Sequence, residues 1–386
     1  MKLVNFIIFF SIVLTINYSI NYYIIIRGLD VLPINSSFRT FFVIAVLFFA
    51  SAYIIGRVIE LIAVNPFSTL LIWIGAFWMA IMVYIFLQLV AIDLLRALNF
   101  FTGFFPAFIK SNYQQTKEVT ALVVLAVTFI TVFFGFINTL FPVIKNYEFN
   151  IAKQRGKLNE LNIVMVSDIH LGTINGNKFL SNVVDKINAL EPDIILIPGD
   201  IIDEDIASVI ENNVGDELKR LDAKYGIYAV TGNHEYIGGV AAAKKYLHEH
   251  NINLLNDEAR LIDNSFYIAG REDLSIKQFT GSRRKPLSEI VKDVDKSYPV
   301  ILLDHQPFKL NQAVENGIDL QLSGHTHHGQ LWPFNFITQA VYELSYGYKQ
   351  KGSSHFYVSC GVGGWGPPVR TGSRPEIVKI FIKFNS

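Results

Sequence analysis

The first 144 residues of this 386-residue chain contain no histidine and very few charged side chains. Only seven of the 33 Lys and Arg residues and four of the 33 Asp and Glu residues lie there. The remaining sequence holds 26 basic and 29 acidic residues, which is the balance of an ordinary soluble domain. We therefore expect a membrane domain over residues 1–144, a linker over 145–159 and a separate domain over 160–386.

The sequence also lacks a second cysteine and an excess of positive charge. A single cysteine, Cys360, excludes an internal disulfide, and the apolar residues before it favour a buried thiol. The net charge of zero, with a slightly acidic second domain, argues against a nucleic-acid partner, because such proteins usually present a basic face. Nothing in the sequence identifies a protein partner.

The apolar stretches of the first domain are long enough to cross a bilayer, which takes roughly 20 residues per helix. Four predicted spans result: 3–26, 40–64, 67–92 and 119–144. The second is the least regular, because it contains Arg57 and Glu60, which can pair on one face of a helix. The loop over 93–118 mixes aromatic and basic residues and can lie in the membrane interface. Four spans predict a multi-pass protein of the cell membrane.

An even number of spans places both ends of the membrane domain on the same side. That side carries six basic residues and the opposite side carries five. Because basic loops tend to stay in the cytoplasm, this count favours a cytoplasmic second domain only slightly and does not decide its side.

All nine histidines come after residue 169, and five of them belong to short motifs with Asp and Asn. In chain order these motifs are Asp168-Ile169-His170, Gly199-Asp200, Gly232-Asn233-His234-Glu235, Asp304-His305 and Gly324-His325-Thr326-His327. Each follows a stretch predicted to be a β-strand: 162–166, 193–198, 225–231, 298–303 and 318–322. Because open α/β sheets bind ligands at the carboxyl ends of their strands, we expect the motifs to converge.

The residue types in these motifs are metal ligands. Imidazole, carboxylate and amide groups suit Zn, Fe or Mn. Two divalent metal ions that share a carboxylate need about this many ligands, drawn from several strand ends. The motifs therefore predict a two-metal hydrolase with a membrane anchor.

Taken together, the five motifs resemble those of the calcineurin-like metallophosphoesterase superfamily, and the resemblance covers residues 160–384. The tracts 323–330 (SGHTHHGQ) and 361–366 (GVGGWG) are similar to those of its membrane-associated bacterial members. This resemblance implies an α/β fold in which a four-layer α/β/β/α sandwich follows the N-terminal transmembrane helices.

The resemblance also assigns roles to individual residues. Seven would bind two divalent metal ions, one held by Asp168, His170 and His327, the other by Asn233, His305 and His325, with Asp200 bridging both. His234 would lie beside the leaving oxygen as a proton donor or charge stabiliser, and Asp203 would orient its imidazole. A hydroxide activated by both metals would attack phosphorus. The ligand types allow Mn, Fe or Zn, and the family precedent favours Mn or Fe.

One departure from the superfamily bears on the substrate. Glu204-Asp205 stands where the phosphoprotein phosphatases have Arg-Gly, so the phosphate-binding arginine of that branch is missing. The resemblance therefore favours phosphodiester, pyrophosphate or small phosphomonoester substrates. Four residues are candidates for substrate contacts, because guanidinium groups suit phosphate and the others flank the motifs: Arg370, Arg374, His328 and Trp365.

Apolar residues follow the last histidine motif, over 331–337, and Trp365 lies among glycines. On a membrane-tethered domain they favour a lipid-linked phosphate, and an equal alternative is that they pack under the site as core or dock on the membrane helices. We thus predict a membrane-anchored dinuclear-metal phosphoesterase that cleaves phosphodiester or pyrophosphate bonds. Two alternatives stay open: a phosphomonoesterase acting on a small substrate, and a metal-binding receptor or scaffold without turnover.

Overall fold

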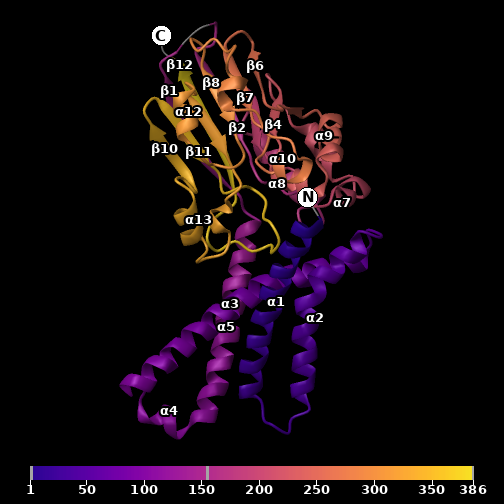
Figure 1. The fold of residues 1–386 in the computed structure, drawn as a ribbon, viewed down its shortest axis with the longest axis vertical. Coiled ribbons are helices and arrows are strands. Elements are labelled where there is room, and N and C mark those ends of the chain that lie inside the picture. The colour runs from indigo at the N-terminus through magenta and orange to yellow at the C-terminus, as the bar shows by residue number, and fades with distance from the viewer. Residues whose placement is uncertain (1–2, 154–155, 385–386) are drawn as a thin grey trace. The chain divides into compact units, whose positions relative to one another are not determined.

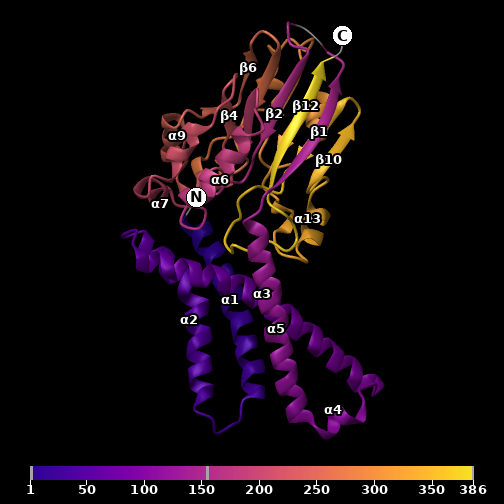
Figure 2. The same cartoon turned by 180° about the vertical axis from the view of Figure 1, so that it is seen from behind.

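The computed structural model describes residues 3–153 and 156–384, and it divides into two compact units. The first unit contains the residues up to Ile137 together with Gly366–Val369. The second contains Asn138–Trp365 and the residues from Arg370 onward. Figure 1 and its reverse view, Figure 2, draw the helical first unit and the mixed α/β second unit.

The first unit is built from helices. They are α1 (Leu3–Val31), α2 (Phe38–Glu60), α3 (Pro66–Thr102), the short α4 (Ala107–Ser111) and α5 (Tyr113–Thr139). Among the described residues, α2, α3 and α5 are each apolar and long enough to cross a membrane, and they overlap the spans predicted over 40–64, 67–92 and 119–144. The span predicted over 3–26 lies within α1, part of whose side chains fall outside the described residues. A fourth crossing by α1 stays a prediction.

Local chemistry explains where α3 begins and ends. The side chain of Asn65 accepts hydrogen bonds of 3.0 Å from the backbone N–H of Phe67 and of Ser68, and Pro66 occupies the first helical turn. At the other end, Gly103 adopts the left-handed conformation that closes a helix. The predicted pairing within α2 is also present, since Arg57 Nη1 lies 2.8 Å from Glu60 Oε2.

The second unit contains two six-stranded sheets. The first has the order β1-β12-β2-β3-β4-β5 and the second the order β10-β11-β9-β8-β7-β6. The strands of the first are β1 (Val143–Ile151), β12 (Glu376–Phe384), β2 (Glu160–Met165), β3 (Ile194–Pro198), β4 (Ile227–Val230) and β5 (Asn253–Leu254). Those of the second are β10 (Gly347–Lys351), β11 (Ser354–Val358), β9 (Leu320–Ser323), β8 (Val300–Leu303), β7 (Phe266–Gly270) and β6 (Glu258–Ile262).

The two sheets pack face to face, with helices on their outer faces. Side chains alternate along a strand, so Ile194 and Leu196 of β3 join the core between the sheets, while Ile195 and Ile197 face outward. The outward residues pack on α6 (Asn177–Asn188) and α9 (Val240–Glu249). On the second sheet, α11 (Leu287–Ile290) and α12 (Asn311–Glu315) cover the outer face. The predicted α/β/β/α layering is thus confirmed.

The linker predicted over 145–159 is wrong for its first half. Residues 145–151 belong to β1, which pairs in parallel with β12 from Val143 opposite Glu376 to Ile151 opposite Phe384 (Figures 1 and 2). Phe149 and Ile151 are buried in the core between the sheets, while Glu148 and Asn150 are exposed. The physical reason is this alternation of apolar and polar residues, which is the pattern of a strand with one buried face.

The remaining helices of the second unit are short and lie between strands: α7 (Ile206–Glu211), α8 (Asn233–Gly238), α10 (Ile276–Thr280) and α13 (Asn335–Val341). Strands β2, β3 and β4 run parallel to one another, as do β7, β8 and β9. As predicted, the five motifs begin at the carboxyl ends of β2, β3, β4, β8 and β9.

Candidate metal centre

Several motif residues have a positive φ angle, a backbone conformation that is uncommon for residues other than glycine. The φ angles are +52° for Asp168, +50° for His170, +53° for Asp200, +73° for His325 and +45° for His327. Such conformations cost free energy and cluster at functional sites, where surrounding contacts impose them. Here the backbone N–H of His170 donates to Asp200 O at 3.1 Å, and that of His325 donates to Asp168 Oδ1 at 2.8 Å.

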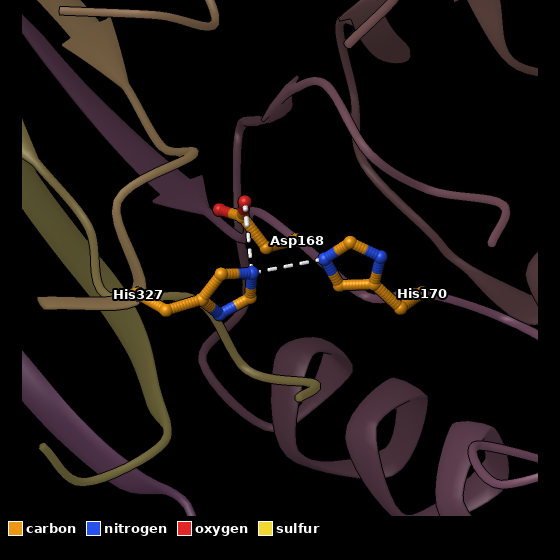
Figure 3. A group of neighbouring side chains, drawn as sticks. All are labelled: Asp168, His170 and His327. Atoms are coloured by element: carbon orange, nitrogen blue, oxygen red, sulfur yellow. Dashed lines mark hydrogen bonds and ion pairs between the residues drawn. The ribbon is translucent and has the colours of Figure 1, made fainter. Parts of the chain in front are cut away.

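Asp168, His170 and His327 form the first group of ligand atoms (Figure 3). The Nε2 atoms of His170 and His327 lie 3.0 Å apart, and His327 Nε2 lies 3.7 Å from Asp168 Oδ1. All three side chains are buried. Two imidazole nitrogens that face each other beside a carboxylate can share one cation, so this group fits a divalent metal ion.

Asp200, His305 and His325 form a second group, and Asn233 completes it. His305 Nε2 lies 3.0 Å from Asp200 Oδ2, and the Asn233 Oδ1 atom is 3.2 Å from His305 Nε2 and 2.8 Å from His325 Nδ1. Asp200 Oδ2 is also 3.9 Å from His170 Nε2 in the first group. One carboxylate therefore lies between the two groups, as a bridging ligand requires.

His234 and Asp203 are adjacent, as the prediction of a catalytic pair requires. His234 Nδ1 lies 3.0 Å from Asp203 Oδ1, and its backbone N–H donates to Asp200 Oδ1 at 2.9 Å. Asp203 Oδ1 is 3.7 Å from His170 Nδ1 as well, so His170, Asp203 and His234 form a third set of neighbouring ligand atoms. The ring of Trp365 meets that of His234 edge to face, with 5.8 Å between their centroids.

Burial and neighbouring charges shift the pKa values of these groups in opposite directions. Burial lowers the pKa of His325 to about 3, and it holds the pKa of His327 well below its usual range. Burial raises the pKa of Asp200, but the imidazoles of His305 and His234 outweigh it and keep that pKa well below the usual value. Burial lowers the pKa of His305, but the carboxylate of Asp200 outweighs it and raises that pKa well above its usual value, so a metal ion bound by His305 would displace a proton.

The donor set as a whole fits two divalent metal ions. Seven imidazole, carboxylate and amide groups converge from five strand ends, and none of them is an exposed surface acid. His170 Nδ1 is buried and has no hydrogen-bond partner among the described residues. A polar atom in that position is expensive unless a further group satisfies it. The residues present thus match the chemistry that the sequence predicts, and the identity of the ions stays a prediction.

Glu235 supports this centre in a way that the sequence reasoning missed. Its buried carboxylate accepts hydrogen bonds from four backbone N–H groups, those of Asp200, Ile201, Ile202 and Gly232, at 3.2, 2.7, 2.9 and 2.7 Å. The contact with Gly232 is the capping box that a glutamate three residues after a helix N-cap predicts. The other three fix the loop that carries Asp200, and no local pattern indicates them.

The four predicted substrate residues are placed differently from one another. Arg370 is only 1% exposed, and its Nη2 donates to His327 Nδ1 at 2.9 Å, so its guanidinium is buried against the ring of a candidate ligand. Arg374 is exposed. His328 is half-buried beside Tyr346 and lines a pocket of about 330 Å³. Trp365 is 50% exposed next to His234.

The two-sheet α/β domain gathers Asp, His and Asn side chains at its strand ends, where they could hold metal ions. Residues 161–329 match the family described as calcineurin-like phosphoesterase. Over 252 residues, the chain is 32% identical to an uncharacterized metallophosphoesterase of Aquifex aeolicus, an alignment that covers 65% of this chain and 95% of that protein. The chain belongs to the calcineurin-like metallophosphoesterase family.

Two further relatives extend the comparison. An uncharacterized metallophosphoesterase of Helicobacter pylori is 33% identical over 224 residues, which cover 56% of this chain and 58% of that protein. A Bos taurus protein described as a transmembrane protein with a metallophosphoesterase domain is 33% identical over 291 residues, which cover 70% of this chain and 65% of that protein. The chain thus spans less than two thirds of the length of these two relatives.

Proposed function

We propose that this protein is a membrane-anchored phosphoesterase that hydrolyses phosphodiester or pyrophosphate bonds with two divalent metal ions. The observation that best supports the proposal is the position of Asp200 Oδ2, which is 3.0 Å from His305 Nε2 and 3.9 Å from His170 Nε2. One carboxylate within reach of both ligand groups is the arrangement of a two-metal hydrolase. When bound, the metal ions would supply an activated water and neutralise the charge of the phosphate.

The protein's own residues complete the chemistry around the phosphate. Asp168, His170 and His327 would hold one ion, and the group of Asp200, Asn233, His305 and His325 would hold the other. His234 lies on the rim of this centre with Nδ1 engaged by Asp203. Its Nε2 is therefore the ring atom that would meet the leaving oxygen and give it a proton.

The surroundings of the centre favour a lipid-linked substrate. The segment after the last motif exposes Trp332, Phe336, Ile337 and Val341, whose exposed fractions are 53, 59, 59 and 57%. These side chains are not core, so the alternative that the whole segment packs inside is disfavoured. Large apolar patches on a protein surface usually bind a partner or a membrane. In a chain with apolar helices of membrane-spanning length, acyl chains are a suitable occupant.

The proposal is tested with the full chain in detergent and added Mn²⁺. Hydrolysis of bis-p-nitrophenyl phosphate is compared with that of p-nitrophenyl phosphate and of a phospholipid diester in the same micelles. We expect diester turnover that Asp200→Ala abolishes and Asp293→Ala leaves intact, because Asp293 is a well-exposed carboxylate with no role in the centre. The full chain is needed, because a fragment from residue 145 would lack the start of β1.

Each result decides between the candidate functions. Turnover of the monoester alone would move the function to a phosphomonoesterase acting on a small substrate. Diester turnover that persists in Asp200→Ala would refute the bridging role of that carboxylate. A folded chain that binds two metal ions without hydrolysing any of the three substrates would leave the receptor or scaffold function.

A further inference from the structure

The metal-ligand candidate His327 is held at two points by one short loop, Arg370–Ser373. Arg370 Nη2 donates to His327 Nδ1 at 2.9 Å, and Ser373 Oγ donates to the carbonyl oxygen of His327 at 2.9 Å. A guanidinium has donors only, so Nδ1 accepts here, and the neutral ring carries its proton on Nε2, the atom 3.0 Å from His170 Nε2. Ligation of a metal ion by Nε2 would move this proton to Nδ1 and release the Arg370 contact, whereas the hydrogen bond from Ser373 Oγ to the backbone would persist. The loop thus fixes the backbone position of His327 in the first ligand group.

The loop itself is fastened at both ends by a single side chain. Asn138 Nδ2 donates to the carbonyl oxygen of Arg370 and to that of Ser373, both at 3.0 Å. A carboxamide nitrogen has two N–H donors, and both are used here. Asn138 lies in the last turn of α5 and is the first residue of the second unit. A further attachment is made by the N–H groups of Thr371 and Gly372, which donate to Gln330 O.

We propose that Asn138 is a positioning residue for the metal ion held by Asp168, His170 and His327. Its two hydrogen bonds set the position of the loop, and the loop, through Ser373 Oγ, sets the position of His327. Without these bonds, the carbonyl groups of Arg370 and Ser373 lose their partner, and the support of His327 loosens. The inference rests on the proposed function in one respect, namely that the first ligand group binds a metal ion.

A consequence is that the last turn of α5 contributes to the metal centre. Only three residues separate the end of α5 at Thr139 from the start of β1 at Val143. This turn would therefore do more than connect the helix to β1.

The expected loss of metal affinity can be judged from residues that hydrogen-bond to metal ligands in other proteins. Removing such a partner typically weakens metal affinity by about 10- to 100-fold. Asn138 acts one step further out, through the loop, so we expect a change near the lower end, about 10-fold in the dissociation constant of one Mn²⁺. The second ion should keep its affinity, because none of Asn233, His305 and His325 contacts the loop in the described hydrogen bonds.

The experiment counts Mn²⁺ bound to the full chain in detergent by equilibrium dialysis over a range of free Mn²⁺. Wild type is compared with Asn138→Asp and Asn138→Leu, which keep the size of the side chain and remove both donors. Asn112→Asp and Asn112→Leu are the matched controls, because Asn112 flanks the other end of α5 and is exposed. Thermal unfolding of each metal-free variant shows whether it is folded.

We expect two Mn²⁺ in wild type and in the Asn112 variants, and one tight plus one weakened Mn²⁺ in the Asn138 variants. Excess Mn²⁺ should restore the second equivalent. If the Asn138 variants fail to fold, Ser373→Ala breaks the same connection at the Ser373 Oγ–His327 contact and should weaken one Mn²⁺ in the same way.

Other outcomes separate this inference from the proposed function. Isotherms that match wild type, or an equal loss of both ions in Asn138 variants, would overturn the positioning role and leave the proposed function standing. Two Mn²⁺ in wild type without hydrolysis would overturn the proposed function alone. A wild-type chain that binds no Mn²⁺ would overturn both.

Discussion

The carboxylate of Glu235 accepts a 2.7 Å hydrogen bond from the backbone N–H of Ile201, a residue 34 positions earlier that directly follows Asp200. Glu235 is 1% exposed, and its second oxygen receives the N–H groups of Asp200 and Gly232. The loop after β3 and the turn after β4 are therefore joined through one side chain. This contact fixes the bridging ligand candidate relative to His234, whose N–H binds Asp200 Oδ1.

Substitution of Glu235 should destabilise the protein before any metal binds. Glu235→Ala leaves buried N–H groups without an acceptor, each worth about 1–3 kcal/mol, and we expect a loss of about 3 kcal/mol in the free energy of unfolding. Glu235→Gln keeps one acceptor oxygen but turns an NH₂ group toward two N–H donors, so it should cost about half as much. Denaturant unfolding of the metal-free variants, with the exposed Glu249→Ala as a control, measures the difference. Equal stability of Glu235→Ala and wild type would contradict the role of the carboxylate.

The single thiol should be inert in the folded protein. Cys360 is fully buried, as its apolar neighbours predicted, and burial raises the pKa of its thiol to about 12. Only the thiolate reacts with disulfide reagents, so at pH 8 we expect no reaction with a dithionitrobenzoate reagent over hours. After unfolding in denaturant, one thiol per chain should react at once. Rapid reaction of the native chain would show that the segment around Cys360 opens readily.

The grouping of the candidate ligands could be predicted from the sequence because each of them lies within a few residues of the strand that positions it. Asp168 comes three residues after the end of β2, and His305 comes two residues after β8. Alternating strands and helices bring such strand ends together, so the short motifs are enough to predict that these side chains lie close to one another. The convergence of Asp200 with His170 and His305 required no knowledge of distant contacts.

Other features depend on contacts that no local pattern encodes. β1 has the alternating residues of a strand, but its pairing with β12, more than 200 residues later, cannot be read from that local pattern. α3 continues to Thr102 because residues such as Leu94, Leu95 and Ala97 favour a helix even where charges end the apolar stretch. Arg370 is a candidate for substrate contacts in the sequence, and its burial follows only from the folding of the tail loop over His327.

Asp203 should affect catalysis more than metal binding. Asp203→Asn removes the charge that orients His234 Nδ1, and we expect kcat to fall about 10- to 100-fold with two metal ions still bound. His305→Ala serves as the contrast, since removing a ligand should release a metal ion and abolish turnover. Bound metal is counted by mass spectrometry of the purified chain beside the steady-state rate. Loss of metal in Asp203→Asn would instead assign Asp203 to the set that it forms with His170 and His234.

The exposed apolar face of α13 should matter for a lipid-linked substrate and not for a soluble one. Phe336 and Ile337 are each 59% exposed on α13, and burying a side chain of this kind in acyl chains is worth about 1.5–3 kcal/mol. Phe336→Ser should therefore lower kcat/KM for a phospholipid diester in micelles by about 10-fold or more and leave bis-p-nitrophenyl phosphate hydrolysis unchanged. Leu261→Ser, on β6 and 38% exposed, is the matched control and should change neither rate. An equal fall for both substrates would mean that Phe336 supports the fold of the metal centre, and no change for either would show that acyl chains do not contact α13.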